Sequence, residues 1–171
     1  MGIDSFAYEL VLYLHILSAI IGFGGVLLNG LYASRARKRP PAEALAVMEV
    51  NTFVSLKVAE VFIYLTGIFG LGLVGLSDDV WEYTDGWILW AIILYVVSLV
   101  VSIALLQPRV RQMVALQREM VEGLSAGTAA GGPPPQAALL EKLGPQIGAL
   151  SGVLHLSFAV ILVLMVWQPG A

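Results

Sequence analysis

Four long apolar stretches, separated by short polar segments, make up most of the chain. A helix of about 20 apolar residues crosses the roughly 30 Å hydrocarbon core of a bilayer, and each stretch reaches that length. The pattern therefore predicts membrane-spanning helices over residues 6–32, 52–76, 87–106 and 147–167. The expected fold is all-α, a four-helix membrane bundle that forms a single domain over residues 1–171.

The polar segments predict how the helices end. Four cations and two prolines within residues 35–41 end the first span, and residues 42–56 are typical of a helix that rises through the interface. Gln107 and Pro108 are expected to end the third span, and a helix-prone segment follows up to Glu122. Residues 123–136 are rich in Gly, Pro and Ala, which predicts a flexible linker.

Composition supports a membrane protein and excludes several kinds of site. Apolar residues make up 58% of the chain and charged residues only 12%, a balance that a water-soluble domain of this size could not bury in one core. The chain has no cysteine, which excludes disulfides, thiolate metal sites and cysteine nucleophiles. Its five methionines are scattered rather than clustered as soft metal ligands are.

The charges indicate an orientation. All nine Lys and Arg residues lie on the side of the membrane reached after the first and third spans. The hairpin over residues 77–86 contains four acids and no base, and Asp4 and Glu9 belong to the same side as this hairpin. Basic loops stay in the cytoplasm, so we expect both termini outside it and the chain in the inner (plasma) membrane.

Polar residues inside the spans are the candidates for chemistry. The two histidines, His15 and His155, lie near mid-membrane on faces that also carry small residues. Ionisable groups at such depth cost about 2.5–3.5 kcal/mol on insertion scales, so they tend to face the bundle interior. Two interpretations stay open: each ring hydrogen-bonds a neighbouring helix, or the pair holds haem b as two axial ligands.

Other polar and small residues complete the set. Glu60 is predicted to accept a proton, to partner His155, or to pair with Lys57 three residues earlier, and the last of these is the interpretation that the spacing favours. Ser98 and Ser102 are the polar groups of the third span. Close helix packing is predicted at glycines, with the fourth span approaching the first: Gly22, Gly67, Gly148 and Gly152.

The layout resembles a family of bacterial four-span integral membrane proteins, domain of unknown function 2269. The resemblance rests on short motifs: Tyr13–Ala19, Gly22, Gly24, Gly25, Arg35–Arg37, Thr66–Gly67, Trp87, Leu106–Pro108 and Leu164–Pro169. More distantly, the chain is similar to membrane protoporphyrinogen oxidases and copper-resistance membrane proteins. The oxidase likeness implies haem b held by His15 and by a lysine soon after Trp87, but residues 88–91 contain no lysine. His155 is then the candidate replacement ligand.

The sequence leaves three functions open. The first is a haem-binding redox or haem-handling protein, and the second is a non-enzymatic scaffold or assembly module whose polar faces only hold helices together. The third is a small transporter, which would need helix breaks or an internal repeat that the sequence does not clearly contain. The expected partner is the lipid bilayer, with a second copy or another membrane subunit left open; no nucleic acid is expected.

Reporter fusions test the predicted orientation. A fusion at Asp79 should report the non-cytoplasmic side and a fusion at Gly131 the cytoplasmic side, because the basic segments decide the orientation. A cytoplasmic signal from Asp79 would reverse the assignment.

Overall fold

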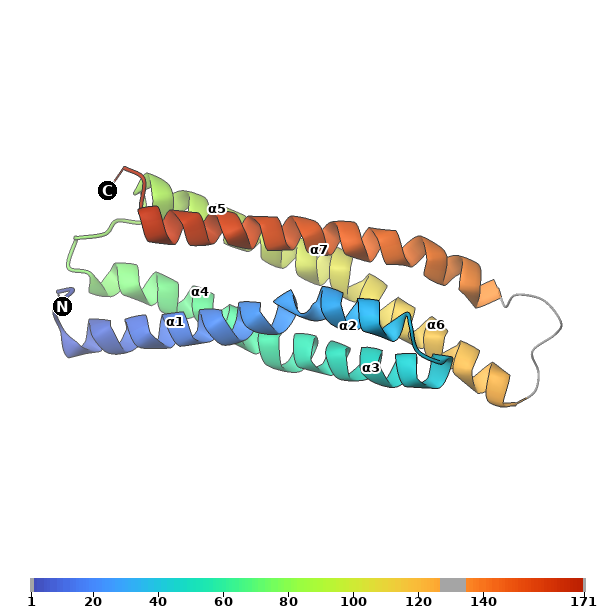
Figure 1. Cartoon of the computed structure of the whole chain (residues 1–171). Coiled ribbons are helices and arrows are strands. Elements are labelled where there is room, and N and C mark those ends of the chain that lie inside the picture. The colour runs from blue at the N-terminus through green and yellow to red at the C-terminus, as the bar shows by residue number, and fades with distance from the viewer. Residues whose placement is uncertain (1, 127–134, 171) are drawn as a thin grey trace. The chain divides into compact units, whose positions relative to one another are not determined.

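The computed structural model describes residues 2–126 and 135–170 (Figure 1). Throughout this described part the secondary structure is helical, with no strand. Its elements in chain order are α1 (Phe6–Leu27), α2 (Asn29–Ala36), α3 (Pro41–Phe53), the π-helical segment η1 (Val54–Ala59), α4 (Glu60–Leu76), α5 (Gly86–Val100), the π-helical segment η2 (Val101–Leu106), α6 (Gln107–Ser125) and α7 (Pro135–Trp167).

Among the described residues, four helical stretches are long and apolar enough to cross a membrane: Phe6–Ala36, Pro41–Leu76, Gly86–Ser125 and Gln136–Trp167. This confirms the predicted all-α membrane fold with four spans. The predicted linker is shorter than expected, because α6 continues to Ser125 and α7 already begins at Pro135. The Ser125 hydroxyl donates to the Val121 carbonyl at 2.9 Å, and proline is favoured in a first helical turn. The rest of that linker lies outside the described residues.

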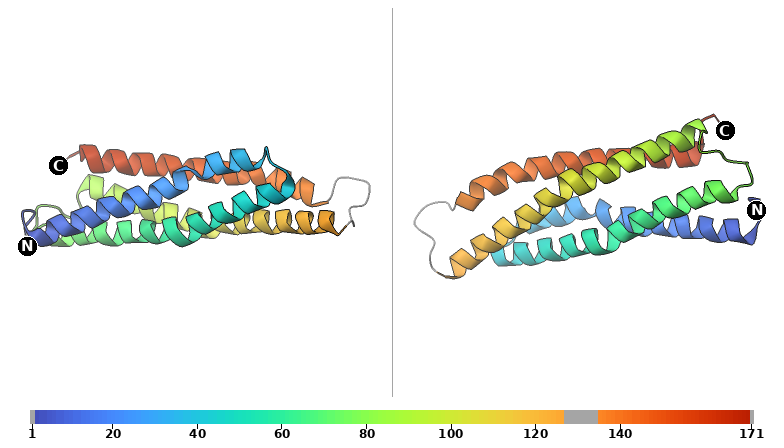
Figure 2. Two further views of the ribbon diagram at one scale, coloured as in Figure 1. Left: turned by 60° about the horizontal axis from the view of Figure 1, so that its bottom comes forward. Right: turned by 180° about the vertical axis from the view of Figure 1, so that it is seen from behind.

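The chain divides into two compact units, and each span contributes to both. Unit 1 comprises Met1–Leu27, Val54–Ser98 and His155–Ala171, and unit 2 comprises Leu28–Phe53 and Leu99–Leu154. In unit 1, α1 runs along α4, as both views in Figure 2 show. In unit 2, α3 packs against both α2 and α6.

The first span is not one continuous helix, in contrast to the prediction. Leu28 interrupts it with φ −78° and ψ −8°, between α1 and α2. The two following residues, Asn29 and Gly30, are weak helix formers. Their low propensity is the local reason for the break.

The second and third spans each contain a π-helical segment that the sequence did not predict. In the third span, η2 directly precedes α6, and Pro108 lies in the first turn of α6 instead of ending the helix. Proline lacks an N–H and its ring clashes with the carbonyl four residues earlier, so a widened turn lets the helix continue. The Arg109 guanidinium donates to the Leu105 carbonyl at 2.6 Å and so satisfies an acceptor in this turn.

The connection between α4 and α5 is a short polar loop, as predicted. The Ser77 side chain is fully buried and joins both sides of the loop. Its hydroxyl donates to the Val74 carbonyl at 2.8 Å and accepts the Trp81 N–H at 3.0 Å. Trp81 packs edge-on against Trp87, with ring centroids 5.4 Å apart.

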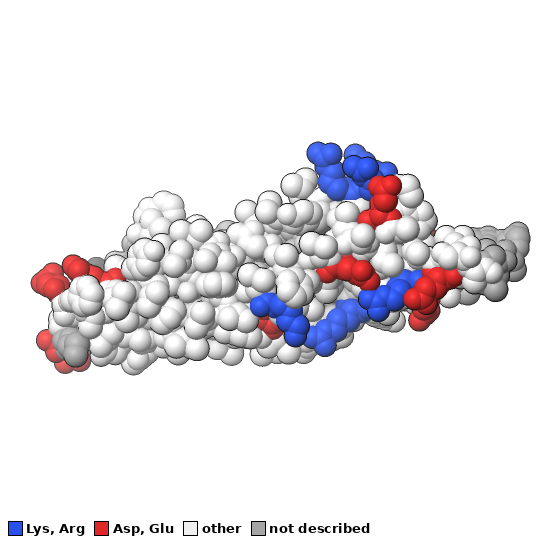
Figure 3. All heavy atoms as spheres, turned by 90° about the horizontal axis from the view of Figure 1, so that it is seen from below, with Lys and Arg blue, Asp and Glu red and all other residues white. Residues whose placement is uncertain are grey.

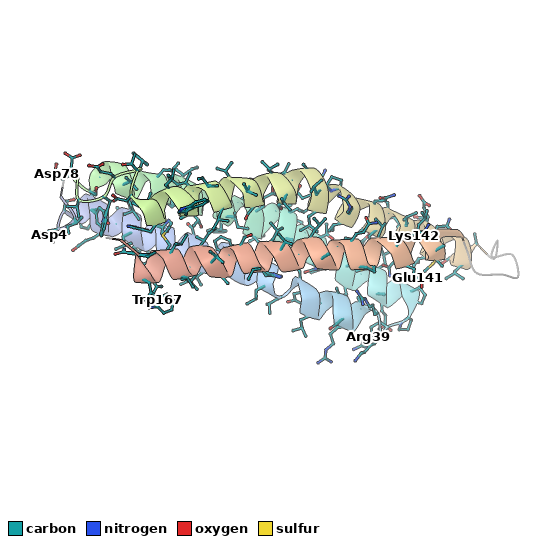
Figure 4. The ribbon with its side chains drawn as sticks, turned by 90° about the horizontal axis from the view of Figure 1, so that it is seen from above. Asp4, Arg39, Asp78, Glu141, Lys142 and Trp167 are labelled. Carbon is teal, nitrogen blue, oxygen red and sulfur yellow. The ribbon has the colours of Figure 1, made fainter. Side chains whose placement is uncertain are left out.

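Acidic side chains gather at one end of unit 1. The start of α1, the end of α7 and the α4–α5 loop all lie at this end (Figure 1). Figure 3 shows Asp and Glu there, and Figure 4 marks Asp4 and Asp78 among them. All Lys and Arg residues except Lys57 belong to unit 2.

Glycines allow close helix approach on α1 and α4. A Cβ added to Gly22 would lie 2.9 Å from the backbone N of Ile63, and one on Gly25 would lie 2.8 Å from the Ala59 Cβ. On α4, a Cβ at Gly67 would lie 2.5 Å from the Tyr95 hydroxyl. Gly22 therefore packs against the second span.

Within unit 2, no described residue packs closely on Gly148 or Gly152, and their predicted approach to the first span stays a prediction. A Cβ added to either meets no described atom within 4 Å beyond its own helix, and both residues are exposed. The less exposed face of α7 in unit 2 carries Leu143, Ile147 and Leu154 instead. Gly148 and Gly152 lie on a different side of α7 from these three residues.

Substitution of Gly22 and Gly24 tests the close approach. Gly22→Ala should lower the melting temperature in detergent, because the overpacking cost of about 1–3 kcal/mol exceeds the gain in helix propensity. Gly24→Ala is the matched control on the same helix, since an added Cβ there has open space. Equal melting temperatures for the two variants would contradict the packing of Gly22 on Ile63.

Candidate functional site in the membrane

His15 hydrogen-bonds α4 from the middle of α1. Its Nδ1 lies 2.9 Å from the Thr66 carbonyl oxygen. A carbonyl can only accept, so Nδ1 carries the proton and donates. The ring also lies against Gly70, where an added Cβ would be 3.0 Å from the His15 Cε1. The glycine thus makes room for the imidazole.

His155 hydrogen-bonds α1 from α7. Its Nε2 lies 3.3 Å from the Val26 carbonyl oxygen, two residues before the break at Leu28. The bond requires a proton on Nε2, again because the carbonyl accepts. Phe158 stacks on Phe23 with ring centroids 3.8 Å apart. These two contacts hold α7 to the end of α1 within unit 1.

The structure does not bring the two histidines together. His15 and Val26 are 11 residues apart on α1, about 16 Å at 1.5 Å per residue, and His155 sits beside Val26. Two axial imidazoles on one iron need ligating nitrogens about 4 Å apart. Haem b held by His15 and His155 together therefore does not fit this geometry. Within the described residues, no group of three or more His, Cys, Asp or Glu side chains could hold a metal ion.

Glu60 is bonded by a side chain of its own helix. The Tyr64 hydroxyl, one turn later, donates to the Glu60 carboxylate. In the part of the chain that the structure describes, no ion pair joins Glu60 to Lys57, which is exposed in η1. The favoured pairing fails because a π turn holds more residues than an α turn, so residues three apart no longer face each other.

Two further side chains, to which the sequence analysis gave no role, bond carbonyls of α4. The Tyr95 hydroxyl donates to the Ile63 carbonyl at 2.9 Å, and the Thr66 hydroxyl donates to the Phe62 carbonyl at 2.8 Å. The run of small residues around Gly67 and Gly70 was the available signal, since it lets side chains of other helices reach this backbone.

The two serines of the third span form no side-chain hydrogen bond among the described residues. The Ser98 hydroxyl on α5 is buried and has no hydrogen-bond partner among the described residues. The indole N–H of Trp87, at the other end of α5, is in the same condition. Ser102 lies in η2, where its carbonyl accepts the Gln107 N–H.

Comparison with known proteins identifies the family. The model of a family described as "Predicted integral membrane protein (DUF2269)" matches residues 9–169. The chain belongs to this family. Membership in DUF2269 agrees with the four spans and assigns no reaction. No curated protein and no solved structure matches the chain.

A double-mutant cycle tests the fit of His15 against Gly70. Gly70→Ala should lower the melting temperature because the added methyl displaces the imidazole, and His15→Ala should remove this cost. Coupling between contacting residues is typically about 0.5–3 kcal/mol. Gly72→Ala is the control, because its Cβ would lie at an ordinary 3.7 Å from Val11. Strictly additive effects of His15→Ala and Gly70→Ala would contradict the contact.

Proposed function

We propose that this protein is a non-enzymatic membrane scaffold, whose intramembrane polar side chains hold its helices together. The observation that carries the proposal is the use made of both histidines: each donates to a backbone carbonyl of another helix, Thr66 or Val26. Such bonds are worth about 0.6 kcal/mol on average in membranes. They favour one arrangement of neighbouring helices without supplying a reactive group.

The remaining polar contacts in unit 1 support the same function. Tyr95 links α5 to the backbone of α4, and Tyr83 donates to the Leu71 carbonyl at 3.0 Å from the loop that follows α4. α4 thus accepts bonds from α1, from α5 and from its own loop. This is the pattern expected of helix packing rather than of an open binding cavity.

Redox or haem-handling activity receives less support from the geometry. His155 on α7 contacts Val26, which lies 11 residues from His15 on α1. The two rings are therefore too far apart to be axial ligands of one haem. The lysine that the oxidase likeness implies after Trp87 is absent from the sequence. The residues present thus supply neither a pair of histidines on one haem nor the lysine ligand that haem binding of this kind requires.

Transport activity has one observation in its favour, the break at Leu28. In transporters, interrupted helices leave backbone carbonyls free to coordinate substrate or a coupling ion. Here the carbonyl of Val26, beside the break, lies within hydrogen-bond distance of His155. That use of the carbonyl favours a scaffold. The inner membrane remains the expected location and the lipid bilayer the expected partner, with a second copy or another membrane subunit left open.

The visible spectrum and two histidine variants test the scaffold proposal. The detergent-purified protein should show no Soret band, and His15→Ala and His155→Ala should each lower the melting temperature by removing an interhelical bond. The expected cost is about 0.6 kcal/mol per bond, the average for such bonds in membranes. A Soret band that disappears or changes in either variant would instead support haem binding.

A further inference from the structure

The turn between α2 and α3 concentrates positive charge in unit 2. Arg35 lies in the last turn of α2, and Arg37, Lys38 and Arg39 follow it directly. Backbone hydrogen bonds from Arg37 to Ala33, Lys38 to Arg35 and Arg39 to Ala36 wind this segment tightly. The four cationic side chains are exposed, and Figure 4 shows Arg39 directed away from the helices. We call these four residues the basic turn.

Most side chains of the basic turn have no partner in the protein. Arg39 pairs with Glu43 at 3.4 Å, but Arg35, Arg37 and Lys38 form no side-chain hydrogen bond or ion pair within the described residues. The cations therefore offer their donors to something outside the chain.

The arginines of α6 differ, although they belong to the same unit. Arg109 donates to Gln146 at 3.1 Å and Arg111 to Gln107 at 3.5 Å. Arg118 forms an ion pair with Glu49 at 2.6 Å. These three guanidinium groups are engaged within the protein. A role in orienting the chain in the membrane would require positive charge but no particular side-chain partner. Such a role therefore does not explain why the arginines of α6 have partners while most cations of the basic turn have none.

Exposed apolar side chains precede the basic turn, at Leu28 directly before α2 and at Leu31 and Tyr32 within it. Leu28, Leu31 and Tyr32 are 44%, 52% and 42% exposed. A surface with apolar side chains beside unpaired cations matches a molecule with an acyl chain and an anionic headgroup. A free phosphate ion would use only the cations.

We propose that the basic turn and the adjacent face of α2 bind anionic phospholipid, with the headgroup phosphate on Arg35, Arg37 and Lys38 and the acyl chains along Leu28 and Leu31. Arginine suits this role because its planar donors match phosphate oxygens in pairs. The site requires neither the scaffold function nor a particular orientation of the chain.

Native mass spectrometry of the full chain in neutral detergent tests the site, with dioleoyl phosphatidylglycerol as the anionic probe and dioleoyl phosphatidylcholine as the zwitterionic one. Phosphatidylglycerol should bind more tightly. Arg35→Gln with Arg37→Gln should weaken its binding by about fivefold for each cation removed, which corresponds to roughly 1 kcal/mol per charge near a membrane surface. A Leu28→Ser, Leu31→Ser variant should also bind it more weakly.

The matched control is Arg109→Gln with Arg111→Gln, which removes the same charge from cations that already have protein partners. It should leave phosphatidylglycerol binding nearly unchanged. Equal losses from the two pairs would mean that net charge alone attracts the lipid and would overturn the proposal. Competition by glycerophosphate, or no effect of the leucine substitutions, would indicate a phosphate site without lipid and would also overturn it. Helicity and melting of each variant report whether it is folded.

Discussion

Hydrocarbon offers no hydrogen-bonding partner, so every polar group that the chain carries into the membrane gains from being bonded inside the protein. In unit 1 the backbone of α4 supplies most of these partners. The carbonyls of Ile63 and Thr66 accept from Tyr95 and His15, which lie on two different helices. The glycines at positions 67 and 70 let those side chains approach closely. The small residues of α4 thus expose its carbonyls to hydrogen-bond donors on neighbouring helices. Larger side chains at these positions would keep the donors out of reach.

The irregular helix segments follow from the same requirement. Pro108 cannot donate to the preceding turn, yet the third span continues because η2 widens the helix and Arg109 bonds a nearby carbonyl. At Leu28 the first span breaks, and His155 lies against the carbonyl of Val26. In both places a side chain serves as partner to the backbone beside an irregularity, which lets that irregularity persist at membrane depth.

The cations of unit 2 divide into two groups by their partners. Those on α6 bond to protein groups, including Glu49 and Gln146, and so contribute to local packing. Those of the basic turn point outward beside exposed leucines. Equal charges therefore serve different purposes, and only the surroundings of each side chain distinguish them. The positive-inside pattern predicts the side of the membrane on which cations lie but not which of them remain available to a ligand.

The sequence by itself determined the all-α class and the four spans, because continuous apolar stretches of about 20 residues cross hydrocarbon as helices. Its short motifs also indicated the membrane family. It also singled out His15, His155 and Glu60 as polar groups inside the spans. The tertiary structure decided the partners of the two histidines, Thr66 for His15 and Val26 for His155. Glu60 instead bonds Tyr64, one turn later on its own helix. The open surroundings of Gly148 were likewise visible only in the tertiary structure. In water, hydrophobic periodicity marks the buried face of a helix, but lipid is as apolar as a protein interior. The sequence pattern therefore identifies a membrane span more readily than the face by which it packs.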